Sequence, residues 1–373
     1  MRIGVPREIK NHEYRVGLTP MAVRELVHHG HQVGIETQAG AAIGFSNEEY
    51  QQAGAEILAD APRVFDWAEM IVKVKEPLAN ERALLKSHHT LFTYLHLAPD
   101  EAQTQDLIKS GAVCIAYETV TDRHGGLPLL APMSEVAGRM SIQAGAHCLE
   151  IAQGGRGVLL GGVPGVAPAK VTVIGGGVVG HNAVDLSIGL GADVTVLDNN
   201  IDTLRALDKQ YRNRIRALYS NRETLEQSVL EADLVIGAVL IPGAAAPKLV
   251  SAEMIKGMKA GAVIVDVAID QGGCFETARA TTHAEPTYLV DDVVHYCVAN
   301  MPGAVARTST MALNNATLPF TLALANKGVK QALQQDVHLL HGLNVCRGKV
   351  THRGVAEAQK LDFLKPEEAL AAI

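Results

Sequence analysis

The hydrophobic positions of this chain form short buried runs that alternate with longer runs of helical period, as in an α/β protein. In the first third of the chain, short apolar runs predict strands at 2–6, 32–36, 70–74, 90–95 and 113–117. Thr19-Pro20 predicts the start of a helix that reaches about His29, because Thr is a favoured N-cap and Pro is favoured in the first turn. A longer helical pattern runs from Met133 to about Ala152.

A second series of strands and helices follows a Gly/Pro-rich loop at 161–168. Its apolar runs predict strands at about 170–174, 194–198, 216–219, 234–239, 262–267 and 296–299. A second long helix is predicted from about Gly303 to Lys327, where Gly328 ends it. The remaining tail, 329–373, is more polar and is expected to contribute helical pieces.

The order of these segments predicts two domains. The length of 373 residues predicts the same, because chains of this length usually form more than one hydrophobic core. We expect an α/β fold of two Rossmann-like domains with parallel sheets. Residues 131–304 would form a nucleotide-binding domain. This domain would be inserted into a discontinuous substrate domain made of residues 1–130 and 305–373, and long helices would join the two.

Composition and charge exclude several classes of function. A net charge of −7 gives no basic footprint for nucleic acid. No apolar run reaches about 18 residues, so no membrane span is expected. The chain starts without the apolar core of a signal peptide, and its five cysteines lack metal-ligand or CxxC spacing. We expect a soluble, cytoplasmic protein with reduced and mostly buried thiols.

The strongest local motif is the glycine run that follows the strand predicted at 170–174. Gly175, Gly177 and Gly180 have the GxGxxG spacing, and a helical pattern follows them. In a dinucleotide site the first glycine permits the tight turn, the second admits the pyrophosphate, and the third lets the helix pack on the strand. The alternative, a glycine-rich turn without a ligand, does not explain why strand, glycines, helix and strand occur in this order.

An acidic residue ends the next predicted strand and indicates which dinucleotide is bound. Asp198 stands at about the expected distance from the glycine motif, and no arginine directly follows it. A carboxylate there accepts hydrogen bonds from the adenosine ribose hydroxyls and repels a 2′-phosphate. The sequence therefore predicts NAD rather than NADP.

Four polar residues lie in loops or at predicted strand ends, where ligands bind in open α/β sheets. They are Arg15, Lys75, His96 and Asp270. Taken singly, each has an ordinary structural interpretation. Arg15 would be a solvated loop charge, Lys75 the mark of a strand end, His96 a structural histidine, and Asp270 a turn or cap residue.

The segments around Arg15, Lys75, His96 and Asp270, together with the glycine motif and Asn300-Met-Pro-Gly-Ala304, closely resemble the L-alanine dehydrogenase family. The resemblance extends over essentially the full length of the chain. The opening MRIGVPREIKNHEYRVGLTP is especially characteristic. The resemblance implies NAD-dependent oxidative deamination of L-alanine to pyruvate and ammonium, and the reverse reaction. It implies that Arg15 and Lys75 bind the substrate carboxylate, that His96 is the general acid/base, and that Asp270 assists proton transfer. It also implies a homohexamer.

The physical chemistry of these side chains agrees with the implied roles. A carboxylate is bound well by the planar guanidinium of Arg together with the compact ammonium of Lys. Loss of ammonia after hydride transfer needs a group that exchanges protons near neutrality, and histidine is the usual one.

The resemblance also implies a set of cofactor contacts at or after the predicted strand ends. They are Ser134, Gly175, Gly177, Val178, Val179, Gly180, Asp198, Thr203, Ser220, Val239, Leu240, Val267, Ala268, Ile269, Asp270, Arg279, Val298, Ala299, Asn300 and Met301. Thr203 is a departure, because relatives often carry a basic residue there. Some members of the family hold a metal in the late helix, but 312–327 contains no carboxylate–His pair. We therefore expect no metal.

Three other functions remain as alternatives. A transhydrogenase subunit binds NAD(H) but needs no carboxylate clamp, so retention of Arg15, Lys75 and His96 argues against it. A catalytically silent NAD sensor is expected to have lost at least one of these groups. An enzyme of the saccharopine dehydrogenase type needs room for a long substrate with two carboxylates, and it is the least firmly excluded.

Overall fold

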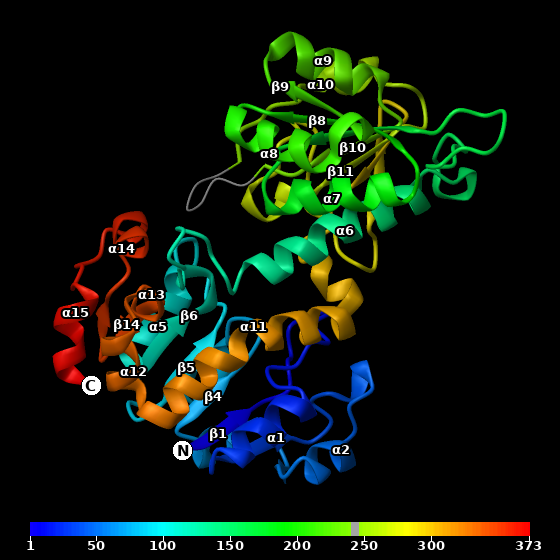
Figure 1. Ribbon diagram of the computed structural model, residues 1–373. Helices are drawn as coiled ribbons and strands as arrows, with labels where there is room; N and C mark the ends of the chain where they lie inside the picture. Colours follow the sequence, from blue (N-terminus) through cyan, green and yellow to red (C-terminus); the bar gives the residue numbers. More distant parts are fainter. Residues whose placement is uncertain (240–245) are drawn as a thin grey trace. The chain divides into compact units, whose positions relative to one another are not determined.

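The computed structural model describes residues 1–239 and 246–373, which fold into two compact units (Figure 1). Unit 1 comprises Met1–Met133 and Val305–Ile373, and unit 2 comprises Ser134–Ala304. The chain leaves unit 1 within helix α6 (Ala131–Cys148) and returns to it just before helix α11 (Ala306–Lys327). Each unit contains one sheet with helices packed on it, so the predicted α/β class is confirmed.

Unit 1 contains an eight-stranded sheet in the order β15-β14-β6-β5-β4-β1-β2-β3. Its strands are β1 (Arg2–Val5), β2 (Gln32–Glu36), β3 (Glu56–Leu58), β4 (Met70–Val72), β5 (Thr90–Thr93), β6 (Val113–Ala116), β14 (Leu343–Cys346) and β15 (Lys349–Val350). Besides α11, its helices are α1 (Pro20–His28), α2 (Asn47–Gln52), α3 (Ala61–Trp67), α4 (Ala79–Arg82), α5 (Glu101–Ser110), α12 (Val329–Gln335), α13 (Val337–Leu340), α14 (Arg353–Gln359) and α15 (Pro366–Ala369).

The expectation that this sheet is wholly parallel was wrong at one edge. Strands β1 to β6 pair in parallel, but β14 pairs antiparallel with β6, and β15 pairs antiparallel with β14. Both antiparallel strands come from the tail, for which only helical pieces were expected. The tail returns to extend the sheet, and Val345 and Val350 join the core formed by α3, β4, β5 and α5.

Local signals fix the starts and ends of several unit 1 helices. The Thr19 side chain accepts a hydrogen bond from Ala22 N at the start of α1, as its N-cap position predicts. Ser46 and Glu49 form a reciprocal capping box on α2. Gly111 ends α5 in the left-handed conformation that glycine adopts without strain.

Unit 2 contains a seven-stranded sheet in the order β12-β13-β11-β10-β7-β8-β9. Its strands are β7 (Lys170–Ile174), β8 (Asp193–Asp198), β9 (Ile215–Tyr219), β10 (Leu234–Gly237), β11 (Val263–Asp266), β12 (Thr287–Val290) and β13 (Val293–Tyr296). Besides most of α6, its helices are α7 (Val178–Gly189), α8 (Ile201–Tyr211), α9 (Arg222–Glu231) and α10 (Ala252–Gly257). The sheet is parallel except for β12, which pairs antiparallel with β13.

Alternate side chains of the unit 2 strands enter two separate cores, one on each face of the sheet. Val171 and Val173 of β7 pack in one core with residues of α6, α7 and α8. Ile174 of the same strand packs in the other core with residues of α9 and α10. Figure 1 shows these helices on both sides of the sheet. Burial on both faces explains why these strands are almost continuously apolar.

Two elements in unit 2 have boundaries that differ by three or more residues from those predicted. The last predicted strand, 296–299, lies three residues too late, because β13 spans Val293–Tyr296 and Val298 beyond it forms only an isolated bridge with Thr281. Helix α6 ends at Cys148 rather than near Ala152, and a 3-10 turn at Ile151–Gln153 follows. The strand β12 was not predicted.

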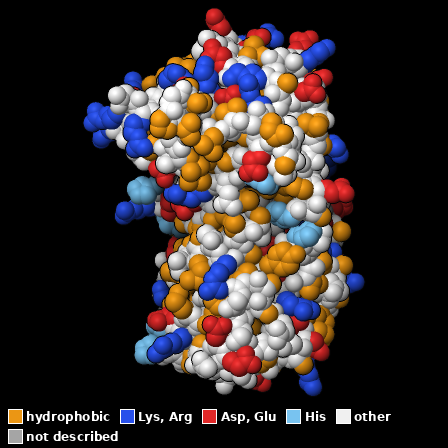
Figure 2. Space-filling model, turned by 90° about the vertical axis from the view of Figure 1, so that its right-hand side faces the viewer, with side chains coloured by type: hydrophobic (Ala, Val, Ile, Leu, Met, Phe, Trp, Pro, Cys, Tyr) orange, Lys and Arg blue, Asp and Glu red, His pale blue; other side chains and the backbone are white. Residues whose placement is uncertain are grey.

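The surface and the cysteines give three further observations. Acidic and basic side chains are both scattered over the face drawn in Figure 2. All five cysteines are free and buried, as predicted. Within 1–239 and 246–373, no helix combines the length and the apolar character needed to cross a membrane.

Candidate active site

The sheet of unit 1 has a topological switch point between β1 and β4. From β1 the chain proceeds outward through β2 and β3 to one edge, then returns to β4 and proceeds the other way through β5 and β6. Ligands of open α/β sheets bind outside the carboxyl ends of the strands at such a point. Arg15 follows β1, Lys75 follows β4, and His96 follows β5. The fold therefore places all three after neighbouring strands of one sheet, in the segments beyond their carboxyl ends.

Arg15 is almost fully buried, at 2% exposed, so its interpretation as a solvated loop charge is wrong. Its Nε and Nη2 atoms donate to the two carboxylate oxygens of Glu13 at 2.7 and 2.6 Å, and its Nη1 donates to Met133 Sδ at 3.1 Å. Burial lowers the pKa of Arg15, but the hydrogen bonds and charge of Glu13 outweigh it, so the pKa lies above its ordinary value. The guanidinium is held charged and in one orientation.

Lys75 is half-buried in the turn after β4, and neighbouring segments hold its backbone. Thr93 Oγ1, at the end of β5, donates to the carbonyl of Lys75 at 3.0 Å. The loop that carries Arg15 also touches this strand end, because a Cβ at Gly17 would lie only 2.6 Å from the carbonyl oxygen of Val72. Glycine at position 17 thus permits the Arg15 loop to lie against the end of β4.

His96 has an unusual backbone and a half-exposed side chain. Its φ of 50° lies in the left-handed region, which a residue with a Cβ rarely adopts without support. Glu118 provides that support, because its carboxylate accepts hydrogen bonds from Leu95 N at 3.2 Å and from His96 N at 2.6 Å. The imidazole also stacks parallel to the ring of Tyr94, with centroids 5.7 Å apart. Its Nδ1 lies 4.0 Å from Glu118 Oε1.

Sequence reasoning missed the acidic and aromatic residues that hold these groups. Glu13 stands two positions before Arg15, but a loop position gave no sign that the two would pair. Glu118 directly follows the strand predicted at 113–117, and this strand-end position is a signal that could have found it. Tyr94 is buried and donates from its hydroxyl to Leu129 O at 2.5 Å, which fixes the ring against His96.

The glycine motif of unit 2 lies at the switch point of the second sheet, between β7 and β10. A Cβ at Gly175, whose φ is 98°, would lie 2.8 Å from Ala238 O, and one at Gly180 would lie 1.7 Å from Gly175 O. Neither position admits another residue without movement of backbone. A Cβ at Gly177 meets nothing within 4 Å, so open space remains at the N-terminus of α7. This cradle fits a pyrophosphate.

Asp198 lies beside the glycine loop, as its predicted role requires. One of its oxygens accepts from Gly176 N at 2.7 Å, and the other accepts from Asn200 N at 2.7 Å. Ser220 lies next to it, since its N–H donates to Asp198 O at 2.9 Å. Thr203 also borders the loop, because its Cγ2 is 2.8 Å from where a Cβ of Gly176 would be.

Asp270 is exposed on the 3-10 turn Val267–Gln271, which follows β11. Asp266, fully buried at the end of β11, holds this loop at both ends. Its carboxylate oxygens accept from Ala268 N at 3.1 Å and from Cys274 N at 3.0 Å. Burial raises the pKa of Asp266 to about 6, although the N–H donors act in the opposite direction. Sequence reasoning included Asp270 but missed Asp266.

The other expected cofactor contacts lie around the same sheet, apart from one that cannot be placed. A Cβ at Gly138 of α6 would lie 2.2 Å from Val179 O, so the helix that carries Ser134 packs closely on the start of α7. The Arg279 guanidinium lies 4.2 Å from the ring centre of Tyr288. Val298 and Met301 are buried, whereas Ala299 and Asn300 are half-buried. Val239 follows Ala238 beside the glycine loop, and Leu240 falls outside the described residues.

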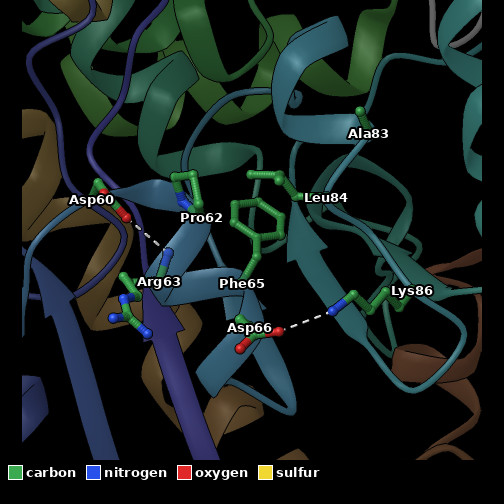
Figure 3. Close-up of a pocket in the computed structure, with 8 residues that line it drawn as sticks. All are labelled: Asp60, Pro62, Arg63, Phe65, Asp66, Ala83, Leu84 and Lys86. Carbon is green, nitrogen blue, oxygen red and sulfur yellow. Dashed lines mark hydrogen bonds and ion pairs between the residues drawn. The ribbon is translucent and has the colours of Figure 1, made fainter.

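A hollow of about 400 Å³ elsewhere on unit 1 is unrelated to these groups (Figure 3). It is lined by Asp60, Pro62, Arg63, Phe65, Asp66, Ala83, Leu84 and Lys86. Asp66 pairs with Lys86 at 3.0 Å, and the Asp60 side chain accepts from Arg63 N at 2.9 Å, so Asp60, Asp66 and Lys86 have partners within the hollow. In the part of the chain that the structure describes, no three His, Cys, Asp or Glu residues gather as metal ligands.

The fold and the glycine loop define the class of this protein: a two-domain α/β protein with a Rossmann-like domain of the dinucleotide-binding type. The chain belongs to the alanine dehydrogenase/PNT family. The family's N-terminal domain model matches residues 4–137, and its C-terminal domain model matches residues 141–353.

Relatives named alanine dehydrogenase resemble this chain over nearly its whole length. It is 62% identical to an alanine dehydrogenase of Halomonas elongata, with 98% of each chain covered. It is 56% identical to alanine dehydrogenase 2 of Staphylococcus aureus, with 99% of this chain and 100% of the relative covered. A solved L-alanine dehydrogenase superposes with a TM-score of 0.94 at 53% identity, covering 96% of this chain and 99% of that one.

A transhydrogenase structure from Sinorhizobium meliloti shares the fold alone. It superposes with a TM-score of 0.80 at 24% identity, covering 95% of this chain and 99% of that one.

Proposed function

We propose that this protein is an NAD-dependent L-alanine dehydrogenase that converts L-alanine to pyruvate and ammonium and also catalyses the reverse reaction. Relatives named alanine dehydrogenase are 56–62% identical over nearly the full chain, which supports this reaction. The observation that carries the proposal is the switch point of unit 1. There a charged, buried Arg15, Lys75 and a half-exposed His96 all follow neighbouring strands of one sheet.

NAD is the proposed cofactor, and unit 2 is its proposed binding domain. The glycine cradle would hold the pyrophosphate at the N-terminus of α7, and Asp198 would bind the adenosine ribose. Ser134, Thr203, Ser220, Arg279 and the loops 267–270 and 298–301 are proposed further contacts. When bound, the nicotinamide ring accepts the hydride that leaves the substrate Cα.

Arg15 and Lys75 are the proposed carboxylate-binding residues. Glu13 engages two donor atoms of Arg15, which fixes the guanidinium plane before substrate arrives. The backbone of Lys75 is fixed by Thr93. A fixed pair of cations binds a carboxylate with little further loss of side-chain freedom, so the Cα–H bond of the substrate takes one orientation.

His96 is the proposed general acid/base, and Asp270 the residue that assists proton transfer. Oxidation of the amine gives an imine, to which water adds before ammonia leaves. These steps need a proton acceptor for the attacking water and a proton donor for the leaving nitrogen, and a half-exposed imidazole can do both. The hydrogen bonds of Glu118 to the backbone at His96 would keep the imidazole in the productive position.

The full set of Arg15, Lys75 and His96 favours amino-acid oxidation over transhydrogenation, which needs no carboxylate clamp. We also propose a homohexamer, as the resemblance implies, which light scattering coupled to size exclusion tests directly. We propose that no metal is required, so turnover should survive dialysis against a chelator.

The test of the reaction is the change in NADH absorbance at alkaline pH, with NAD and a panel of L-amino acids. A parallel assay supplies pyruvate, ammonium and NADH. Fast turnover of alanine in both directions is the expected result. Turnover of a long amino acid with two carboxylates instead would favour the saccharopine type, and tight NADH binding without any turnover would favour the transhydrogenase or sensor alternatives.

A further inference from the structure

Two positions before Lys75, a second lysine is fully buried between two acidic side chains. Lys73 Nζ lies 3.2 Å from Glu8 Oε2 and 2.7 Å from Glu81 Oε1, and none of the three side chains is more than 3% exposed. Burying an ammonium and two carboxylates is costly, and apolar residues of similar volume often stabilise a fold as well or better. The proposed reaction makes no use of these three charges, so their presence needs another explanation.

The second oxygen of each carboxylate binds the backbone of the turn that carries Lys75. Glu8 Oε1 accepts from Val74 N at 2.7 Å and from Lys75 N at 3.3 Å. Glu81 Oε2 accepts from Leu78 N at 2.8 Å. One buried ammonium thus anchors two carboxylates, which in turn hold both ends of residues 74–78.

The charges in this cluster are strongly coupled to one another. Burial lowers the pKa of Lys73, but the charges of Glu8 and Glu81 outweigh it and leave the pKa above its ordinary value. Burial raises the pKa of Glu8, against the opposing effect of Lys73. The charge of Glu8 also acts on Arg15. The Glu8 carboxylate thus contacts the backbone of Lys75 and also acts electrostatically on Arg15, the two residues proposed to bind the substrate carboxylate.

We propose that Glu8 is a positioning residue for substrate binding. By joining Lys73 Nζ to the N–H groups of Val74 and Lys75, it fixes the direction of the Lys75 side chain toward the substrate carboxylate. This inference rests on the proposed function, because it assumes that Lys75 binds that carboxylate. Glu8 acts through the backbone of Lys75, because its own side chain is buried against Lys73.

The variant that tests it is Glu8→Gln. A glutamine cannot accept from the Val74 N–H and also accept from the Lys73 ammonium, because one of its two terminal atoms is a donor. We expect KM for alanine and the inhibition constant of propionate, a carboxylate without an amino group, to rise roughly tenfold. The kcat should change much less, and NADH affinity, measured by fluorescence, should not change.

The matched control is Asp233→Asn in unit 2. Asp233 also accepts a backbone N–H, from Lys170 at 2.8 Å, and pairs with a lysine, Lys259, at 3.0 Å. It lies at the start of β10, whereas the glycine loop lies at the other end of the parallel strands. This variant should lose a comparable interaction and leave both KM and the propionate constant unchanged.

A double-mutant cycle with Lys75→Gln shows whether Glu8 acts through Lys75. If it does, Glu8→Gln adds nothing to KM in the Lys75→Gln background. An equal increase in both backgrounds, or a wild-type KM in folded Glu8→Gln, would overturn the inference. A wild-type KM in Lys75→Gln alone would instead overturn the proposed role of Lys75. If Glu8→Gln does not fold, Glu8→Asp, which keeps the charge but is one methylene shorter, takes its place in the same cycle.

Discussion

The carboxylate of Glu118 accepts a 2.6 Å hydrogen bond from the backbone N–H of His96, a residue held at a φ of 50°. The left-handed conformation costs a non-glycine residue on the order of 1 kcal/mol. A hydrogen bond to a charged group contributes about 1.5–3 kcal/mol, so this contact is sufficient to offset the cost of the left-handed conformation. Glu118 thus sets the backbone from which the imidazole projects.

We predict that Glu118→Gln lowers kcat by roughly 10- to 100-fold, because a small displacement of a catalytic group is enough to cause such a loss. An amide oxygen could take the place of Oε1, which accepts from both Leu95 N and His96 N, but it lacks the negative charge. The amide NH2 in place of Oε2 would face the Leu95 N–H, so the loop relaxes. Steady-state kinetics and NADH titration together test this. The variant His96→Ala sets the lower limit for turnover, and a Glu118→Gln enzyme with wild-type kcat would show that the backbone contact is unimportant.

A second prediction concerns the pairing of Arg15 with Glu13. Arg15→Lys keeps the charge but cannot make two parallel bonds to Glu13, so the cation should lose its fixed direction. We expect KM for alanine and for pyruvate to rise roughly 10- to 100-fold, equivalent to about 1.5–3 kcal/mol. Unchanged KM values in both directions would remove Arg15 from substrate binding.

A third prediction concerns cofactor choice. Asp198→Ala removes the carboxylate that borders the glycine loop and holds Gly176 N. We expect weaker NAD binding and a smaller preference for NAD over NADP, because the charge that repels a 2′-phosphate is gone. The ratio of kcat/KM for the two cofactors measures this directly. If that ratio equals the wild-type value, the acidic residue does not select the cofactor.

A fourth prediction follows from the buried Asp266, whose pKa is raised to about 6 by desolvation. An acid with a raised pKa in the folded state binds its proton more tightly there than in the unfolded chain. Its stabilising contribution is therefore complete below an unfolded pKa of about 3.9 and is lost as pH rises through about 6. The loss is on the order of 3 kcal/mol for a shift of about two units.

Urea unfolding of wild type and Asp266→Asn across this pH window tests the sign. The free energy of unfolding of wild type should fall relative to that of the variant as pH rises from about 4 to 7. Lys248, which donates to the carbonyls of Gly272 and Phe275 beside this loop, is unchanged in the variant. Parallel stability curves would mean that Asp266 does not titrate in this range.

The sequence predicted most of the parallel strands because each is a short, nearly continuous apolar run, as in Val171 to Ile174. It failed for Leu343–Cys346, which pairs antiparallel with β6 after a separation of more than two hundred residues. The local sequence does not indicate such a pairing, because the hydrogen-bonded partner strand is distant along the chain. The strand Glu56–Leu58 was not predicted either, because a run of three residues is too short to show a hydrophobic period.

The candidate site was predicted in part, for a related reason. Strand ends indicated Lys75, His96 and Asp198 because the carboxyl edge of a parallel sheet gathers polar residues. The sequence did not indicate that Lys73 is buried while Lys75, two positions later, is half-exposed. That difference depends on Glu8 and Glu81, which only the folded chain brings to Lys73. Partners of buried charges are set by tertiary packing.

The most direct test of the account follows the hydrogen on the substrate Cα. The enzyme is incubated with NAD and L-alanine deuterated at Cα, and the reduced cofactor and the keto acid are analysed by mass spectrometry. We predict one deuterium in the reduced cofactor for each pyruvate formed, because the hydride passes from Cα to the nicotinamide. Pyruvate formation with unlabelled NADH, or no pyruvate despite bound NAD, would contradict the proposed reaction.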